Sequence, residues 1–132
     1  MILYTLTPTG ISRPFGFTED ILMLHFADLT PEQIKIICNG CGPKGGLLKV
    51  PDFLFKASCN HHDFRYWRGC SEQDRFNADT DFLTMMLIDA GEDHELQAIA
   101  HAYFMAVRCW GFACFHYADL PRAENDLALL FA

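Results

Sequence analysis

The sequence predicts a single all-α domain, and three observations carry this prediction. A chain of 132 residues can bury one hydrophobic core, and 51% of the residues are hydrophobic. Segment 92–116 repeats apolar residues at spacings of three and four, which is typical of an amphipathic helix. Helix-capping residues and glycines divide most of the remaining chain into helical lengths. We found no repeat, linker or low-complexity segment, so we expect one helical bundle.

The first third of the chain contains two helix starts. Residues 1–17 are expected to form an N-terminal arm that is irregular or briefly extended. Thr18 then resembles an N-cap followed by acidic residues, which predicts a helix. A second N-cap at Thr30, directly before Pro31, predicts a short helix that ends near residues 38–40.

A glycine-rich loop precedes the longer helices. Residues 39–50 hold four of the nine glycines, which predicts unusual backbone angles. Two antiparallel helices are then expected over 51–69 and 72–90, the second capped by Ser71. Segment 92–116 is expected to pack against them as a third helix.

Composition narrows the function classes. The formal net charge of −7 argues against a nucleic-acid partner, which selects clustered lysines and arginines. No apolar run has the length of a transmembrane helix. The first residues lack the basic start and apolar centre of a signal peptide.

The cysteine content points to an oxidising compartment. Six cysteines are an even number and a high density for a cytosolic protein, which favours two to three disulfides. We therefore expect a secreted, extracellular or periplasmic protein, while a cytoplasmic origin or a non-classical export route stays open. Reduced cysteines or a metal site are the alternatives.

Asp79 is the most informative single residue. At 100° per residue it falls about 40° from Leu83, inside the apolar stripe of helix 72–90, while Asp74 and Asp81 point away. A carboxylate that faces a core is costly unless a partner satisfies it. We expect Asp79 to be buried and paired; the alternative is an imperfectly packed helix that leaves it exposed.

The expected partners lie on the preceding helix. His62 and Tyr66 are four residues apart and therefore share one helix face. A single helical histidine is usually structural. Opposite a buried Asp79, however, His62 would have its tautomer fixed and would keep one nitrogen free to take a proton from water. The Asp63 side chain points about 100° away from that of His62, so it can bind a different group.

We expect the group that Asp63 contacts to be a hard cation. Successive carbonyls of a glycine-rich loop can converge on calcium, and one carboxylate from a nearby helix can complete the set of ligands. We expect Asp63 to be that carboxylate, although most glycine-rich loops are ordinary turns.

These residues match a known pattern. The motif Cys59-x-x-His62-Asp63-x-x-Tyr66, after a Cys-Gly-x-x-Gly-Gly segment, resembles the active-site helix and calcium loop of secreted phospholipases A2, most closely the small prokaryotic ones. Segments 75–82 and 103–111 resemble the later helices of that family. The likeness covers residues 38–111 in the family's order.

The resemblance implies a calcium-dependent carboxylic ester hydrolase acting on a phospholipid membrane or micelle. His62 would deprotonate the water that attacks the sn-2 ester, releasing a fatty acid and a lysophospholipid. Asp79 would orient His62, and Tyr66 would steady Asp79. The Gly42 N–H would assist at the oxyanion. The calcium ligands would be Asp63 and loop carbonyls near Gly40, Gly42, and Lys44 or Gly45, because the loop has one residue more than the family's pattern.

The resemblance also implies a disulfide between Cys41 and Cys59, which would join the loop to the catalytic helix. The other four cysteines have no secure match in the family. We expect Cys38 to pair with Cys109 or Cys114.

Two other interpretations remain. The first is a zinc module built from Cys38, Cys41 and Cys59 with His61 or His62, which have suitable ligand types for tetrahedral zinc. It leaves the glycines and Asp79 unexplained, and tightly held zinc would distinguish it. The second is a catalytically inactive phospholipase A2-like binding protein, which only an activity assay would distinguish.

Overall fold

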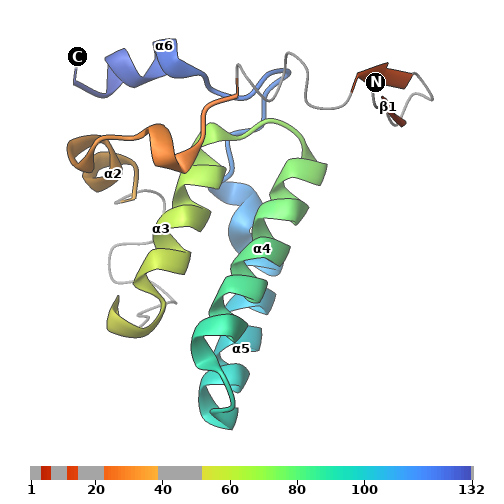
Figure 1. Cartoon of the computed structure of the whole chain (residues 1–132), viewed down its shortest axis with the longest axis vertical. Helices are drawn as coiled ribbons and strands as arrows, with labels where there is room; N and C mark the ends of the chain where they lie inside the picture. Colours follow the sequence, from red (N-terminus) through yellow and green to blue (C-terminus); the bar gives the residue numbers. More distant parts are fainter. Residues whose placement is uncertain (1–3, 7–11, 15–22, 39–51, 132) are drawn as a thin grey trace.

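The computed structural model of the chain describes residues 4–6, 12–14, 23–38 and 52–131. Within them the fold is mostly helical, as predicted. Three long helices, α3 (Asp52–Arg68), α4 (Glu72–Ala90) and α5 (His94–Trp110), lie side by side with α4 packed against both others (Figure 1). The turn between α3 and α4 is short, so these two helices run antiparallel.

Shorter elements flank the three long helices. Strands β1 (Tyr4–Leu6) and β2 (Ser12–Pro14) pair antiparallel in the region expected to be briefly extended. Helix α2 (Pro31–Ile37) packs on α3. The remaining short elements are η1 (Phe26–Asp28), η2 (Gly111–Ala113), α6 (Glu124–Leu127) and η3 (Ala128–Phe131).

Helix starts follow the predicted caps. The Thr30 hydroxyl accepts from the Gln33 N–H, and the Gln33 side chain returns to the Thr30 N–H. Ser71 and Asp74 cap α4 in the same reciprocal way. Helix α4 has the predicted bounds. The helix predicted at Thr18 falls mostly outside the described residues, and residues 23–25, the next described ones, are not helical.

The prediction of one helix over 92–116 is wrong at both ends. Helix α5 begins later because the Asp93 side chain accepts from the Glu95 and Leu96 N–H groups and so acts as the N-cap. It ends at Trp110, where the 3₁₀ turn η2 begins, and Gly111 at this junction lies against Tyr66. A Cβ at Gly111 would stand 2.2 Å from the Tyr66 hydroxyl oxygen.

Three groups of buried side chains hold the helices together. The largest joins α3, α4 and α5 through Phe55, Phe82, Met86, Ala90 and Ala100. The second joins α2 and α6 to the other face of α3 through Leu24, Leu29, Ile37, Phe64 and Leu127. The third lies beside the candidate site and consists of Tyr66, Ala78 and Phe115.

The disulfide expected at Cys38 is not formed. Its thiol is free and donates to the Asn60 carbonyl of α3 at 3.2 Å. Helix α2 holds Cys38 next to α3, whereas Cys109 lies exposed on α5, which packs on α4. The pairing of Cys38 with Cys109 or Cys114 is therefore corrected. The Cys41–Cys59 pairing involves a residue outside the described ranges and stays a prediction.

In the described part of the chain, no helix combines the length and the apolar character required to cross a membrane.

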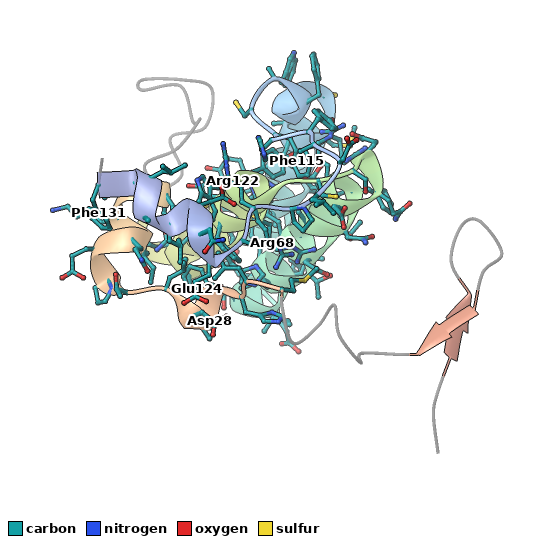
Figure 2. All side chains as sticks on the ribbon, turned by 90° about the horizontal axis from the view of Figure 1, so that it is seen from above. Asp28, Arg68, Phe115, Arg122, Glu124 and Phe131 are labelled. Atoms are coloured by element: carbon teal, nitrogen blue, oxygen red, sulfur yellow. The ribbon has the colours of Figure 1, made fainter. Side chains whose placement is uncertain are left out.

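The C-terminal segment closes over the end of α3. Figure 2 labels Arg122 of this segment and Arg68 at the end of α3. The Arg122 N–H donates to the Arg68 carbonyl at 2.7 Å, and the Arg122 guanidinium donates to the Trp67 carbonyl at 2.7 Å. Arg68 in turn donates to the Leu24 carbonyl at 2.8 Å. Arg122 thus satisfies the Trp67 and Arg68 carbonyls, which the end of α3 leaves without intrahelical partners.

The turn from α3 to α4 depends on the same segment. The Cys70 N–H donates to the His116 carbonyl at 2.9 Å, and the His116 N–H donates to the Tyr66 carbonyl at 3.2 Å. Gly69 has a φ of +72°, and a Cβ built on it would stand 1.9 Å from the His116 carbonyl oxygen. Glycine is required here both by its backbone angle and by the close backbone contact.

We predict that Gly69→Ala destabilises the protein more than Gly91→Ala does. Both glycines have positive φ, but a Cβ at Gly91 would meet nothing within 4 Å. Gly91→Ala should therefore cost only backbone strain, about 1–3 kcal/mol. Gly69→Ala adds a clash with backbone, and we expect about 1–3 kcal/mol more. Urea denaturation of both variants measures the difference, and equal losses would contradict the proposed contact.

Candidate active site

Asp79 is fully buried at the centre of the helices, as the sequence predicts. Its Oδ1 lies 2.7 Å from His62 Nε2 and accepts a second hydrogen bond from the Tyr66 hydroxyl at 2.7 Å. Its Oδ2 accepts from Arg108 Nη1 at 2.6 Å, and Arg75 Nη1 stands 3.6 Å away. Both oxygens of a buried carboxylate are thus bound, and two cations balance its charge.

The His62 ring is held in one orientation. It stacks on Phe82 with ring centres 4.4 Å apart and contacts Tyr66 at 4.2 Å. An ionised carboxylate only accepts hydrogen bonds, so the neutral His62 ring carries its proton on Nε2, which faces Asp79. Its Nδ1 is then an unprotonated acceptor.

The protonation states in this cluster favour a neutral His62 beside an ionised Asp79. Burial lowers the pKa of His62 below its ordinary value, and this outweighs the opposing effect of Asp79. Burial raises the pKa of Asp79, but hydrogen bonds from His62, Tyr66 and Arg108 outweigh it and hold that pKa low. Burial and the neighbouring Asp79 raise the pKa of Tyr66, so its hydroxyl stays a donor.

A second layer of charges surrounds this cluster. Glu72 accepts hydrogen bonds from Arg75 at 2.8 Å, from Arg108 at 3.3 Å and from the Tyr117 hydroxyl. These bonds, those from Arg75 first, lower the pKa of Glu72 to about 2. Arg75 also donates to the Val107 carbonyl at 3.0 Å and so ties α4 to the last turn of α5.

Sequence reasoning missed both arginines. Arg75 is four residues before Asp79 on α4, and this spacing of opposite charges could have indicated that the two side chains interact. Arg108 reaches Asp79 from a different helix, 29 residues further along the chain, and no local pattern indicates that contact.

Asp63 lies in a different environment from Asp79. It follows His62 on α3 but is turned away from the cluster, and it is partly buried. Burial raises the pKa of Asp63 to about 7, and among the described residues no hydrogen bond or ion pair to its carboxylate is formed. Burial and the nearby Asp63 charge together raise the pKa of the Cys38 thiol to about 12. Asp63 therefore lies near the point where the chain enters the glycine-rich loop.

The remaining predicted ligands cannot be placed beside Asp63. Gly40, Gly42, Lys44 and Gly45 lie outside the described residues, as does Cys41. The described residues contain no group of three His, Cys, Asp or Glu side chains that could hold a metal ion. In the zinc interpretation, His62 would bind the metal through Nδ1, the ring nitrogen that does not face Asp79. His61 is separate from the cluster and packs on Phe26, with ring centres 5.8 Å apart.

Comparison of the chain with models of protein families, with curated proteins and with solved structures gave no match.

We predict that Asp63→Asn stabilises the metal-free protein at pH 8 but does so less at pH 5. The folded pKa of about 7 lies above the roughly 3.9 of an unfolded aspartate. The ionised carboxylate therefore costs stability above about pH 7, and the cost falls as pH drops below that value. We expect a gain of about 1–3 kcal/mol at pH 8 after allowance for solvent screening.

Urea denaturation at both pH values with a calcium chelator measures this gain. Asp81→Asn is the control, because Asp81 is exposed and pairs with Arg65 at 2.7 Å. A gain at Asp63 that does not change with pH would mean that burial does not disfavour this carboxylate.

Proposed function

We propose that this protein is a calcium-dependent phospholipase A2-type enzyme that hydrolyses the sn-2 ester of glycerophospholipids. The observation that carries the proposal is the His62–Asp79 pair, in which Nε2 is fixed at 2.7 Å from a buried carboxylate and Nδ1 is left as an acceptor. Both residues, with Tyr66, stand in the motifs that resemble this family.

His62 is the general base of the proposed reaction. Nδ1 takes a proton from the water that attacks the ester, and the ring becomes positively charged as the new bond forms. The ionised Asp79 stabilises that charge without accepting the proton itself. The neutral His62 ring favoured by burial is the form that can accept the proton.

Asp63 is the proposed side-chain ligand of calcium. A partly buried carboxylate with no described donor is suited to a hard cation. Loop carbonyls near Gly40, Gly42 and Lys44 or Gly45 would complete the set. Bound calcium would polarise the ester carbonyl, and the Gly42 N–H would add a donor at the same oxygen.

The proposed Cys41–Cys59 disulfide would hold the loop at this place. Cys59 and Asp63 are four residues apart on α3 and therefore share one face of the helix. A bridge to Cys59 would keep the loop over the Asp63 carboxylate and limit its conformational freedom. A disulfide with this role fits an exported protein.

One assay tests the proposal directly. Purified protein is incubated with phosphatidylcholine in mixed micelles, and free fatty acid is measured with calcium or with a calcium chelator. We expect sn-2 hydrolysis that stops on chelation and returns when calcium is added back. Absence of hydrolysis from folded, oxidised protein in calcium would reject the enzymatic proposal, and tightly bound zinc in that protein would favour the zinc module.

We predict that His62→Gln abolishes hydrolysis and that Asp79→Asn lowers it by about 10²- to 10⁴-fold. Glutamine cannot act as the base, and asparagine at position 79 does not hold the required tautomer. Asp81→Asn should change activity little, because Asp81 is exposed and pairs with Arg65. Circular dichroism checks the fold of each variant, and comparable losses at Asp79 and Asp81 would refute the orientation argument.

We also predict that Asp63→Asn weakens calcium binding and hydrolysis together, since it removes the proposed anionic ligand. Titration calorimetry measures calcium affinity, and thermal unfolding with and without calcium measures the linked stabilisation. An unchanged calcium affinity in this variant would show that the cation binds elsewhere.

A further inference from the structure

We propose that Arg108 is a positioning residue of this active site. By binding Oδ2 of Asp79, it keeps Oδ1 directed at His62. The effect on turnover rests on the proposed function, whereas the effect on the His62 ring can be measured without any activity.

The argument begins with how the two oxygens of Asp79 are used. His62 and Tyr66 both bind Oδ1, at 2.7 Å each. Among the described residues, Arg108 donates the hydrogen bond to Oδ2, at 2.6 Å. The terminal torsion of an aspartate is broad and nearly two-fold, so a carboxylate bound through one oxygen can turn. A strong, charge-assisted bond at the second oxygen removes this freedom.

Arg75 cannot take over this role in the observed geometry. Its Nε and Nη2 donate to Glu72, and its Nη1 donates to the Val107 carbonyl at 3.0 Å. The same Nη1 stands 3.6 Å from Asp79 Oδ2, which is beyond a good hydrogen bond. Arg75 thus helps to balance the charge of Asp79. Its bond to Val107 also fixes the turn of α5 that carries Arg108.

Arg108 is itself held by further contacts. Its Nη2 donates to Glu72 Oε1 at 3.3 Å, and its guanidinium lies over the Phe76 ring, 5.1 Å from the ring centre. Both contacts come from α4, which runs beside α5 (Figure 1). The guanidinium therefore has a defined position from which to hold Asp79. Helix α5 thus contributes a positioning residue to the proposed active site, although the predicted catalytic residues all lie on other elements.

The kinetic test compares three variants in the presence of calcium. Arg108→Gln should lower kcat by about 10- to 100-fold with little change in KM, because the group acts through the catalytic pair and does not touch substrate. Arg108→Lys should be intermediate, because an ammonium keeps the charge but lacks the planar fork that binds Asp79 and Glu72 together. Arg65→Gln removes an equal charge that pairs with exposed Asp81 and should behave as the parent.

The structural test uses ¹⁵N NMR of the His62 ring at a pH where the ring is neutral. The parent and Arg65→Gln should show one tautomer, with the proton on Nε2. Arg108→Gln should show a mixture of both tautomers, and Arg108→Lys a smaller share of the second. If the glutamine variant does not fold, the lysine variant decides the question in both measurements.

The outcomes separate the two proposals. Parent-like kcat and a single tautomer in the folded Arg108 variants would overturn the role of Arg108. A parent protein without hydrolysis would reject the proposed function, and the tautomer comparison would still decide whether Arg108 positions the pair. A merely structural role would lower the stability of the variants and leave the tautomer unchanged, which also counts against the proposal.

Discussion

The charge of Asp79 is the constraint on which the rest of the structure depends. Removing an ion from water costs several kcal/mol in real proteins even after relaxation. Here the cost is offset by groups from two other helices: His62 and Tyr66 on α3 and Arg108 on α5. The three helices must pack at one relative position for these contacts to form. Fold and candidate site are therefore specified by the same interaction.

The two aspartates that neighbour His62, the proposed general base, show how environment can separate two roles. Asp79 has both oxygens bound, so its pKa is held low and its position is fixed. Asp63 is partly buried without a described donor, and its pKa is raised to about 7. Groups with the same chemistry thus become an orienting anion and a proposed metal ligand. Their separation follows from the helix itself, since consecutive side chains point about 100° apart.

Local rules predicted much of this arrangement from the sequence. The caps at Thr30 and Ser71 gave the starts of α2 and α4, and the apolar stripe of α4 gave the burial of Asp79. The contacts between elements that are far apart in the chain were not predicted. Gly111, just after α5, lies against Tyr66 of α3, and the partner of Asp79 Oδ2 comes from far along the chain. Periodicity carries no information about either contact, because it describes one helix at a time.

The position of Arg108 in the chain has a consequence for synthesis of the protein. On the ribosome α3 and α4 emerge before α5, so the His62 and Tyr66 partners of Asp79 are made before its Arg108 partner. Until α5 follows, the carboxylate lacks the guanidinium at Oδ2, and the turn at Gly69 lacks the backbone partner that His116 supplies. These contacts between α3, α4 and the rest of the fold are completed only by residues in the C-terminal part of the described chain. A nascent chain that stops short of Arg108 would lack the guanidinium that binds Asp79 Oδ2, and the proposed orientation of His62 and Asp79 would be one of the last features acquired.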